Sequence, residues 1–337
     1  MFKEIGLAAS MLKNFWNFII QQLLAPLLDK FGGVLLSKRV YKNLIQQRDS
    51  ACDDLIKVEL LKHKRGISIV VFSKDRAIQL HAFIRSYANN VEGNYPVQVI
   101  YFTSSEKHQK SYDELNHYCI NKKLNINFIR ERNSFKETLL GVLETIDMSN
   151  IVFFVDDIIF LNSLDIEQLN SIDSQSYILS LRHSPYLRKN YTANIDQLPP
   201  KLYPSNLSRD LLEFKWFMAG NEWSDPWSLD GQVLSTAEVK ILTRISEFFG
   251  PNTYEAALKS FGYLAKKKAG LCYKNSKIMN MPINRVQTEY HNRSGQVSVD
   301  FLLGQWNSGL AIDIKRFAGY IPQAPHEEHE LIFEKRL

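Results

Sequence analysis

The chain has 337 residues, of which 45% are hydrophobic and 23% charged, an ordinary composition for a globular protein. Fibrous, collagen-like and wholly disordered proteins are thereby excluded. Lysine and arginine exceed aspartate and glutamate by 41 − 36 = 5, which fits an anionic small-molecule ligand or an acidic membrane surface and argues against nucleic acid as a partner. The three cysteines, Cys52, Cys119 and Cys272, have no zinc-binding spacing. A reducing cytoplasm is the expected location.

The first thirty residues are predicted to contain an amphipathic helix. Phe15 and Trp16 share an apolar face with several Leu and Ile residues, while Asn17 and Gln21 lie on the opposite face. The uncharged stretch 14–28 is too short and too polar to span a bilayer, and a secretory signal is disfavoured because no cleavage site follows. Two roles stay open: packing on protein, including a second copy in a homodimer, and peripheral contact with the inner membrane surface.

A regular alternation of strands and helices follows a polar stretch, residues 38–65, that predicts one or two solvated helices. Strands are expected at 67–72, 97–102, 126–129 and 151–155, and helices at about 77–88, 112–121 and 135–146. Parallel neighbours need such crossover connections. The fold class predicted is therefore α/β, with a mostly parallel sheet flanked by helices and an N-terminal helical arm.

The pattern becomes less regular after residue 157. We expect a strand at 177–181, a long loop at 186–208, an aromatic-rich stretch at 211–227, helices at 236–248 and 253–266, and short strands or loops from 278 on. The sequence predicts a boundary near Arg65. Residues 1–65 would form the arm and residues 66–337 one domain of catalytic size.

Two adjacent aspartates, Asp156 and Asp157, come directly after the apolar strand 151–155. Ligands of open α/β sheets bind at the carboxyl ends of the strands. Buried carboxylates need a positive partner, and Mg²⁺ or Mn²⁺ is commonly held by one or two carboxylates together with substrate phosphates. The alternative is a strand-end turn whose carboxylates cap a helix or pair with Lys or Arg.

This arrangement resembles glycosyltransferases of the GT-A fold, and specifically bacterial enzymes related to glycosyltransferase family 2. Val155-Asp156-Asp157 stands where those enzymes carry a DxD-type element after the fourth strand, although here the aspartates are adjacent. Val71-Phe-Ser-Lys-Asp-Arg76 is similar to their first-strand loop, and Ser228-Leu-Asp-Gly231 and Pro251-Asn-Thr-Tyr-Glu255 look like later segments. The resemblance runs from about residue 67 to 293. It implies a nucleotide-sugar half at about 66–160 and an acceptor half at about 161–300.

The resemblance also implies roles for individual residues. Asp157 and Asp156 would hold the metal, and His291 would complete its site, the alternative for His291 being a surface histidine. Further residues are expected to contact the donor, either because the resemblance implies it or because their charge suits a diphosphate. They are Phe72, Ser73, Lys74, Asp75, Arg76, Thr103, Lys136, Asp156, Arg182, Arg285 and Arg293. A carboxylate must also deprotonate the acceptor in an inverting transfer. Chain order favours Glu255, then Asp230, with Glu222 or Asp225 behind; Glu255 also suits a first helical turn.

The expected function is a metal-dependent transfer of a sugar from a nucleotide-sugar donor to a glycan or lipid-linked glycan, with inversion. A nucleotidyltransferase remains an alternative, and so does a glycan-binding or scaffold protein on an inactive transferase fold. The segment His326-Glu-Glu-His329 imitates metal-ligand spacing but is expected to be a polar tail, because the HExxH signature is absent.

Overall fold

The structure is a computed structural model that describes residues 37–218, 220–287, 289 and 293–336. The chain divides into two compact units, residues 1–54 and 55–337. Helix α3 (Lys38–Leu60) takes the place of the one or two helices predicted between residues 38 and 65. The amphipathic helix predicted in the first thirty residues lies outside the described part of the chain, and the domain boundary near Arg65 stays a prediction. In the described residues no helix is both long and apolar enough to span a membrane.

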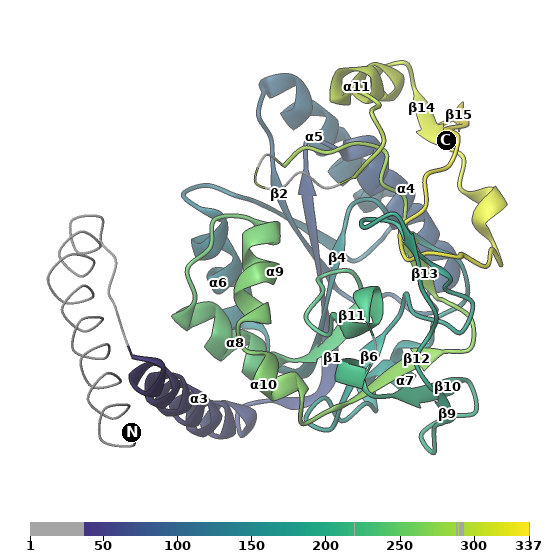
Figure 1. Ribbon diagram of the computed structural model, residues 1–337. Helices are drawn as coiled ribbons and strands as arrows, with labels where there is room; N and C mark the ends of the chain where they lie inside the picture. The colour runs from purple at the N-terminus through teal and green to yellow at the C-terminus, as the bar shows by residue number, and fades with distance from the viewer. Residues whose placement is uncertain (1–36, 219, 288, 290–292, 337) are drawn as a thin grey trace, which may run out of the picture. The chain divides into compact units, whose positions relative to one another are not determined.

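The second unit is built on a nine-stranded sheet with the strand order β3-β2-β1-β4-β11-β6-β12-β10-β9 (Figure 1). Its first four members are β1 (Lys64–Lys74), β2 (Val97–Phe102), β3 (Ile126–Arg130) and β4 (Met148–Val155), and all of them run parallel. The predicted parallel α/β sheet is therefore confirmed for this part of the chain.

The remaining sheet strands form a mixed arrangement. They are β6 (Tyr177–Ser180), β9 (Tyr203–Pro204), β10 (Leu211–Phe214), β11 (Gln232–Ser235) and β12 (Ala269–Tyr273). Strand β11 runs antiparallel to both β4 and β6. The beginning of β11 and the end of β6 consequently lie beside the carboxyl end of β4. Residues far apart in sequence therefore meet at this end of the sheet.

Helices cover both faces of this sheet (Figure 1). Helices α4 (Ala77–Asn90) and α5 (Glu106–Asn121) connect β1 to β2 and β2 to β3, whereas α6 (Phe135–Thr145) connects β3 back to β4. Crossovers between parallel strands are right-handed, so reversing the direction of travel along the sheet places α6 on the opposite face. Helix α8 (Thr236–Ile245) packs beside α6, and α11 (Val299–Asn307) packs beside α4 and α5.

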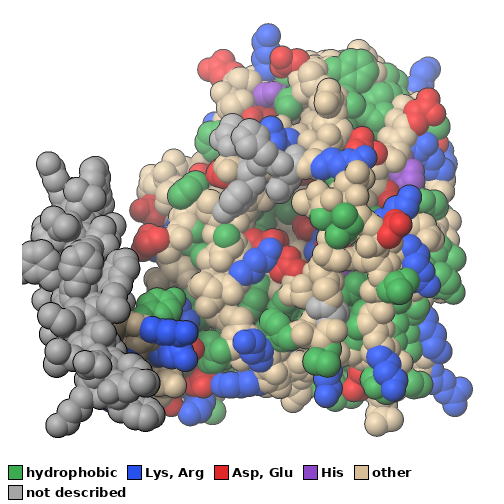
Figure 2. Space-filling model, viewed as in Figure 1, with side chains coloured by type: hydrophobic (Ala, Val, Ile, Leu, Met, Phe, Trp, Pro, Cys, Tyr) green, Lys and Arg blue, Asp and Glu red, His purple; other side chains and the backbone are tan. Residues whose placement is uncertain are grey.

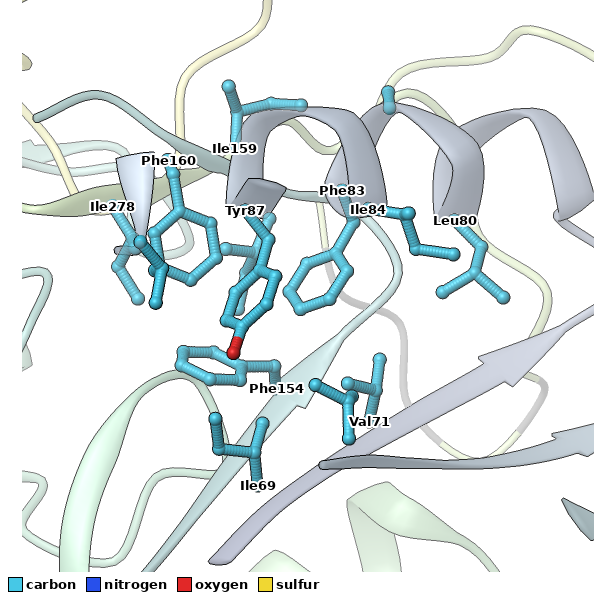
Figure 3. Packing of buried hydrophobic residues seen from close by; sticks show 14 of the residues in the cluster. Ile69, Val71, Leu80, Phe83, Ile84, Tyr87, Phe154, Ile159, Phe160 and Ile278 are labelled. Atoms are coloured by element: carbon cyan, nitrogen blue, oxygen red, sulfur yellow. The ribbon is translucent and has the colours of Figure 1, made fainter. Parts of the chain in front are cut away.

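The core lies between α4 and the parallel strands (Figure 3). Phe83 of α4 points towards Phe154 of β4, with ring centroids 5.6 Å apart, and Tyr87 meets the edge of the Phe160 ring at 5.5 Å. Strand β4 is buried on both faces because helices cover them both. This packing fixes the end of β4, where the two aspartates follow.

Short elements complete the unit. They are β5 (Ile158–Phe160), α7 (Ile166–Asn170), β7 (Lys189–Asn190), β8 (Ile195–Asp196), the 3-10 turns at Trp216–Met218, Asn221–Ser224 and Lys315–Phe317, α9 (Pro251–Lys259), α10 (Gly262–Ala265), β13 (Ile278–Asn280), β14 (Leu310–Ile312) and β15 (Phe333–Lys335). Strand β13 pairs with β5, β14 with β15, and β7 with β8.

Three predictions on these elements were wrong in detail. The single helix expected at 253–266 is divided into α9 and α10 at Ser260 and Phe261, with Gly262 at the start of the second helix. The loop expected at 186–208 contains the short strands β7, β8 and β9. Helix α11 was not expected, because its nine residues include Gly304 and give only a weak periodic signal.

Candidate active site

A cavity of about 630 Å³ opens at the carboxyl ends of the parallel strands. Its walls combine residues that follow β1, β2, β3 and β4 with residues that follow β6 and precede β11. Figure 2 shows a hollow near the centre of this face, with acidic and basic side chains close to each other inside it. This is the sheet edge at which ligands of open α/β sheets bind.

Asp156 ties the end of β4 to the loop after β1. Its Oδ2 accepts hydrogen bonds from Ser73 Oγ at 2.8 Å and from Lys74 N at 3.3 Å. Its Oδ1 pairs with Nη1 of Arg76 at 3.0 Å, and only 2% of the residue is exposed. Both carboxylate oxygens thus have protein donors, so this side chain fixes the shape of the first-strand loop.

Asp157 faces the other side of the cavity. Its Oδ1 accepts from Asn280 Nδ2 at 3.1 Å, and its backbone oxygen accepts from Met281 N at 2.8 Å. Its Oδ2 lies 3.8 Å from Nη1 of Arg76. Burial, reinforced by the neighbouring carboxylates of Asp156 and Asp230, raises the pKa of Asp157 to about 6 against the opposing effect of Arg76.

Arg182 holds Asp230 beside these aspartates. Its Nη1 lies 2.9 Å from Asp230 Oδ2, and Nε2 of His326 approaches the same oxygen at 3.6 Å. Burial alone would raise the pKa of Asp230, but Arg182 and His326 lower it to about 2. Asp230 is consequently ionised at neutral pH and only weakly basic. Glu222 Oε2 lies 3.9 Å from Nη2 of the same arginine.

Glu255 belongs to a separate ion-pair group on α9. Its Oε1 lies 2.7 Å from Lys259 Nζ, and its Oε2 accepts from Leu229 N at 3.0 Å. The same ammonium lies 2.9 Å from Asp225 Oδ2. Burial and the charge of Glu255 raise the pKa of Asp225. In the free protein Glu255 therefore orders the segment before β11 as well as lining the cavity.

Most of the site residues predicted from the sequence line this one cavity. They are Phe72, Ser73, Lys74, Arg76, Asp156, Asp157, Arg182, Asp230, Glu255, Arg285 and Arg293. Glu222 and Asp225, the weaker candidates for the base, line it too. The structure therefore brings together residues spread over more than half of the sequence.

Three predicted residues do not line the cavity. Asp75 accepts a hydrogen bond from Ser104 N at 2.7 Å and has a left-handed φ of 55°, so it shapes the turn after β1. Thr103 is buried and donates to Gln109 Oε1 at 3.0 Å. Lys136 pairs with Glu247 at 2.8 Å. His291 lies outside the described residues.

Among the cavity residues that the sequence analysis missed are two polar residues beside Asp157 and Asp230. His326 was expected in a polar tail, and this was wrong, because its ring is largely buried against Asp230. Asn280 ends β13 and bonds Asp157. The only signal for either is a polar residue next to an apolar run, which is too common to single out a site. Their positions depend on the pairing of β13 with β5 and on an isolated bridge from Asn280 to His326.

The residues present fit a divalent cation bound jointly with a phosphate ligand. Among the described residues, no three His, Cys, Asp or Glu side chains form a metal-binding cluster. Asp157 nevertheless offers a buried carboxylate whose pKa is raised first by burial and then by the neighbouring carboxylates of Asp156 and Asp230. Mg²⁺ and Mn²⁺ sites commonly use one or two carboxylates and complete their shell with phosphate oxygens and water. Asp157 suits this kind of site.

Comparison with known proteins supports a glycosyltransferase resemblance. No protein-family model matches the chain. The chain is 28% identical over 269 residues to the bifunctional glycosyltransferase pgtA of Dictyostelium discoideum. The alignment covers 68% of this chain and 33% of pgtA, so the chain spans about a third of that relative's length. The resemblance to glycosyltransferases predicted from the motifs is thereby confirmed.

Solved structures show more distant likenesses. S. aureus TarS 1-349 in complex with UDP gives a TM-score of 0.41 at 12% identity, covering 72% of this chain and 70% of that one. Mannosyltransferase PcManGT from Pyrobaculum calidifontis, in complex with GDP-Man and Mn2+, gives a TM-score of 0.26 at 13% identity over 35% of each chain. At these TM-scores neither likeness carries an argument about the ligands of this chain.

Proposed function

We propose that this chain is a glycosyltransferase that moves a sugar from a nucleotide-sugar donor to a glycan or lipid-linked glycan acceptor, in a metal-dependent and inverting reaction. The observation that carries the proposal is the Asp156-Asp157 pair at the carboxyl end of β4, inside a cavity that combines both halves of a chain similar to a glycosyltransferase. The cavity volume of about 630 Å³ suits a ligand of nucleotide-sugar size.

The β1–β3 side of the cavity suits the nucleoside. The ring of Phe102 at the end of β2 is 38% exposed and lines the cavity, so a base has an aromatic face to stack on. Lys74 Nζ lies 5.5 Å from the centre of that ring and faces the same space. Asp156, through its bonds to Ser73 and Arg76, keeps the loop in the shape that this docking requires.

The centre of the cavity suits the diphosphate. Asp157 would hold the divalent cation, and such a cation would supply Lewis-acid stabilisation of the charge that develops on the leaving diphosphate. Arg76 is buried beside it with its guanidinium held between Asp156 and Asp157, which places a fixed positive charge at the same point. The far side of the cavity carries the carboxylates from which the base for the acceptor hydroxyl would come, Glu255 being the first candidate.

Donor hydrolysis tests the proposal directly. Purified protein is incubated with a panel of nucleotide sugars, with Mn²⁺ and with EDTA, and the released products are separated. Slow Mn²⁺-dependent release of a nucleoside diphosphate supports the transferase, and release of pyrophosphate supports a nucleotidyltransferase instead. If no member of the panel is cleaved or raises the melting temperature, the result favours a glycan-binding or scaffold protein.

The location and assembly of the protein belong to the same proposal. The enzyme would work in the cytoplasm, peripherally at the inner membrane surface through residues 1–30, or as a homodimer through them. The apolar face predicted from the sequence is compatible with either role.

A further inference from the structure

The charges along the cavity are unevenly distributed. Ser73, Lys74 and Phe102 lie on the β1–β2 side, and Asp156 and Asp157 lie at the end of β4 in the middle. The side formed by β6, β11 and α9 carries four carboxylates, contributed by Glu222, Asp225, Asp230 and Glu255. A nucleotide sugar laid along this edge with its base on the β1–β2 side and its diphosphate at Asp157 places its sugar among those carboxylates.

The cations on this acidic side are already matched by carboxylates. Arg182 lies 2.9 Å from Asp230 and 3.9 Å from Glu222. Lys259 lies 2.7 Å from Glu255 and 2.9 Å from Asp225. His326 contacts Asp230 at 3.6 Å. Even with His326 protonated, four carboxylates face three cations among the described residues here, so an additional anion would meet net negative charge.

A separate observation concerns a polar atom next to Asp157 and the acidic side. Asn280 lines the cavity although only 2% of its surface is exposed, and its Oδ1 has no hydrogen-bond partner in the described part of the structure. Its Nδ2 is held by Asp157, so the amide cannot turn without losing that bond. A buried amide oxygen left unpaired is costly, and a donor group on a ligand would satisfy it. Carboxylate and amide oxygens together accept from hydroxyls and repel anions.

We infer that the sugar transferred by this protein is uncharged, a hexose or an N-acetylhexosamine, and that the acidic side of the cavity rejects nucleotide-linked uronic acids. This inference rests on the proposed function. A uronic acid differs from its hexose by a carboxylate in place of the C6 hydroxymethyl group. On this side that carboxylate would meet like charges, because Arg182 and Lys259 already contact carboxylates of the protein, and like-charge contacts are unfavourable.

Matched donors test the inference in the unmodified full chain. A thermal-shift comparison of UDP and GDP with Mn²⁺ first identifies the nucleotide. Calorimetric titration then compares UDP-glucose with UDP-glucuronate and UDP-galactose with UDP-galacturonate, or GDP-mannose with GDP-mannuronate. We expect each neutral donor to bind at least about tenfold more tightly than its uronic acid partner. Equal or tighter binding of the uronic acids overturns the inference while leaving the transferase proposal intact. Absence of any nucleotide binding overturns both.

Two substitutions separate the local effect from net charge. Glu222→Gln removes one negative charge from the acidic side and leaves Arg182 paired with Asp230. It should reduce the preference for the neutral donor severalfold. Glu131→Gln removes the same charge from the β3 side of the cavity and should leave that preference unchanged. Equal effects of the two substitutions on this preference would contradict the placement of the sugar on the acidic side. An unchanged preference in Glu222→Gln, in a protein with a normal melting curve, would contradict it too.

Discussion

The strands β1–β4 and the segments after Asp157 form two sides of one cavity, but they reach it by different routes. On the first side each cavity residue lies at or just after the end of a parallel strand, so a regular topology places it. On the second side the residues come from an antiparallel strand, a helix start, a 3-10 turn and a segment near the end of the chain. Their placement depends on ion pairs such as Arg182–Asp230 and Lys259–Glu255.

The two adjacent aspartates divide between these sides. Asp156 bonds to Ser73, Lys74 and Arg76 of the first side, whereas Asp157 bonds to Asn280 of the second. The two residues form the turn between β4 and β5, so this turn is bonded to both sides of the cavity. Adjacent carboxylates in one motif thus have different partners: Asp156 holds the first-strand loop, and Asp157 is the one proposed to hold the cation.

The largest effect is expected from Asp157→Ala. Loss of this carboxylate should abolish transfer, by more than about 10³-fold in turnover, because the proposed cation would lose its protein ligand. The fold should remain intact, since Asp157 makes a single side-chain hydrogen bond to Asn280 among those described. The measurements are donor hydrolysis and a circular dichroism melt. Wild-type turnover in this variant, or full activity of the wild type in EDTA, would exclude the metal assignment.

The next effect concerns the base on the second side. Glu255→Gln should lower turnover by roughly 10²- to 10⁴-fold while donor affinity changes little, as is typical of a lost general base. Asp230→Asn is the comparison, because the low pKa of Asp230, about 2, makes it a weak base. Kinetics are measured with a saturating acceptor.

The opposite pattern would reassign these two residues. If Glu255→Gln lowers the melting temperature and keeps turnover, its bonds to Lys259 and Leu229 are its whole role. Loss of turnover in Asp230→Asn would then identify Asp230 as the base. A product of retained configuration would remove the need for such a base.

Asp156→Ala should act mainly on stability. Both oxygens of this carboxylate are bonded, and its removal leaves the longer contact to Asp157 as the carboxylate partner of the buried Arg76 guanidinium, which also donates to the backbone oxygen of Asn284. Breaking one partner of a buried ion pair costs about 3 kcal/mol or more in the free energy of unfolding. Urea unfolding of the Asp156 and Asp157 variants measures the difference. Equal losses of stability in the two variants would refute the division of tasks between them.

Two buried histidines allow a pH comparison of helix α4 with the segment that follows β6. Burial, with Arg85 and Arg336, lowers the pKa of His81 on α4 to about 3, and burial lowers the pKa of His183 after β6 well below 6.5. Below pH 6.5 the unfolded chain binds protons that the folded chain does not, so stability falls as the pH falls from 6.5 towards 3. One such histidine accounts for about 1.4 kcal/mol per pH unit in this window.

Substitution of each histidine measures its contribution to the pH dependence of stability. Between pH 7.5 and pH 5, His81→Gln should lose about 2 kcal/mol less stability in urea unfolding than the wild type loses. His183→Gln should change the pH dependence in the same direction. An unchanged pH dependence in both variants would contradict the burial of these rings.

Deletion of residues 1–30 should have the smallest effect on the reaction, because none of the cavity residues named above belongs to this segment. Turnover on a soluble acceptor should stay within about twofold of the wild type, while binding to anionic liposomes measured by sedimentation is lost. Retained liposome binding would contradict a membrane role. A change in oligomeric state, measured by light scattering, would instead identify a packing role.

The sequence determined the elements with strong local signals. The apolar runs that became β1, β2, β3 and β4, and the periodic segments between them, predicted a parallel sheet because crossovers of that length allow little else. Asp156 and Asp157 were found at the end of a buried strand because charge next to an apolar run is unusual and costly.

The positions of the other site residues depend on the tertiary structure, because contacts between segments distant in sequence place them. Asn280 enters the cavity through the pairing of β13 with β5, two segments more than a hundred residues apart, and His326 enters through its bridge to Asn280. Lys136 looked like a cation for the donor, but its position on α6 directs it to Glu247. No local pattern distinguishes such residues from other polar side chains, since their burial and charge partners exist only once the sheet has brought distant segments together.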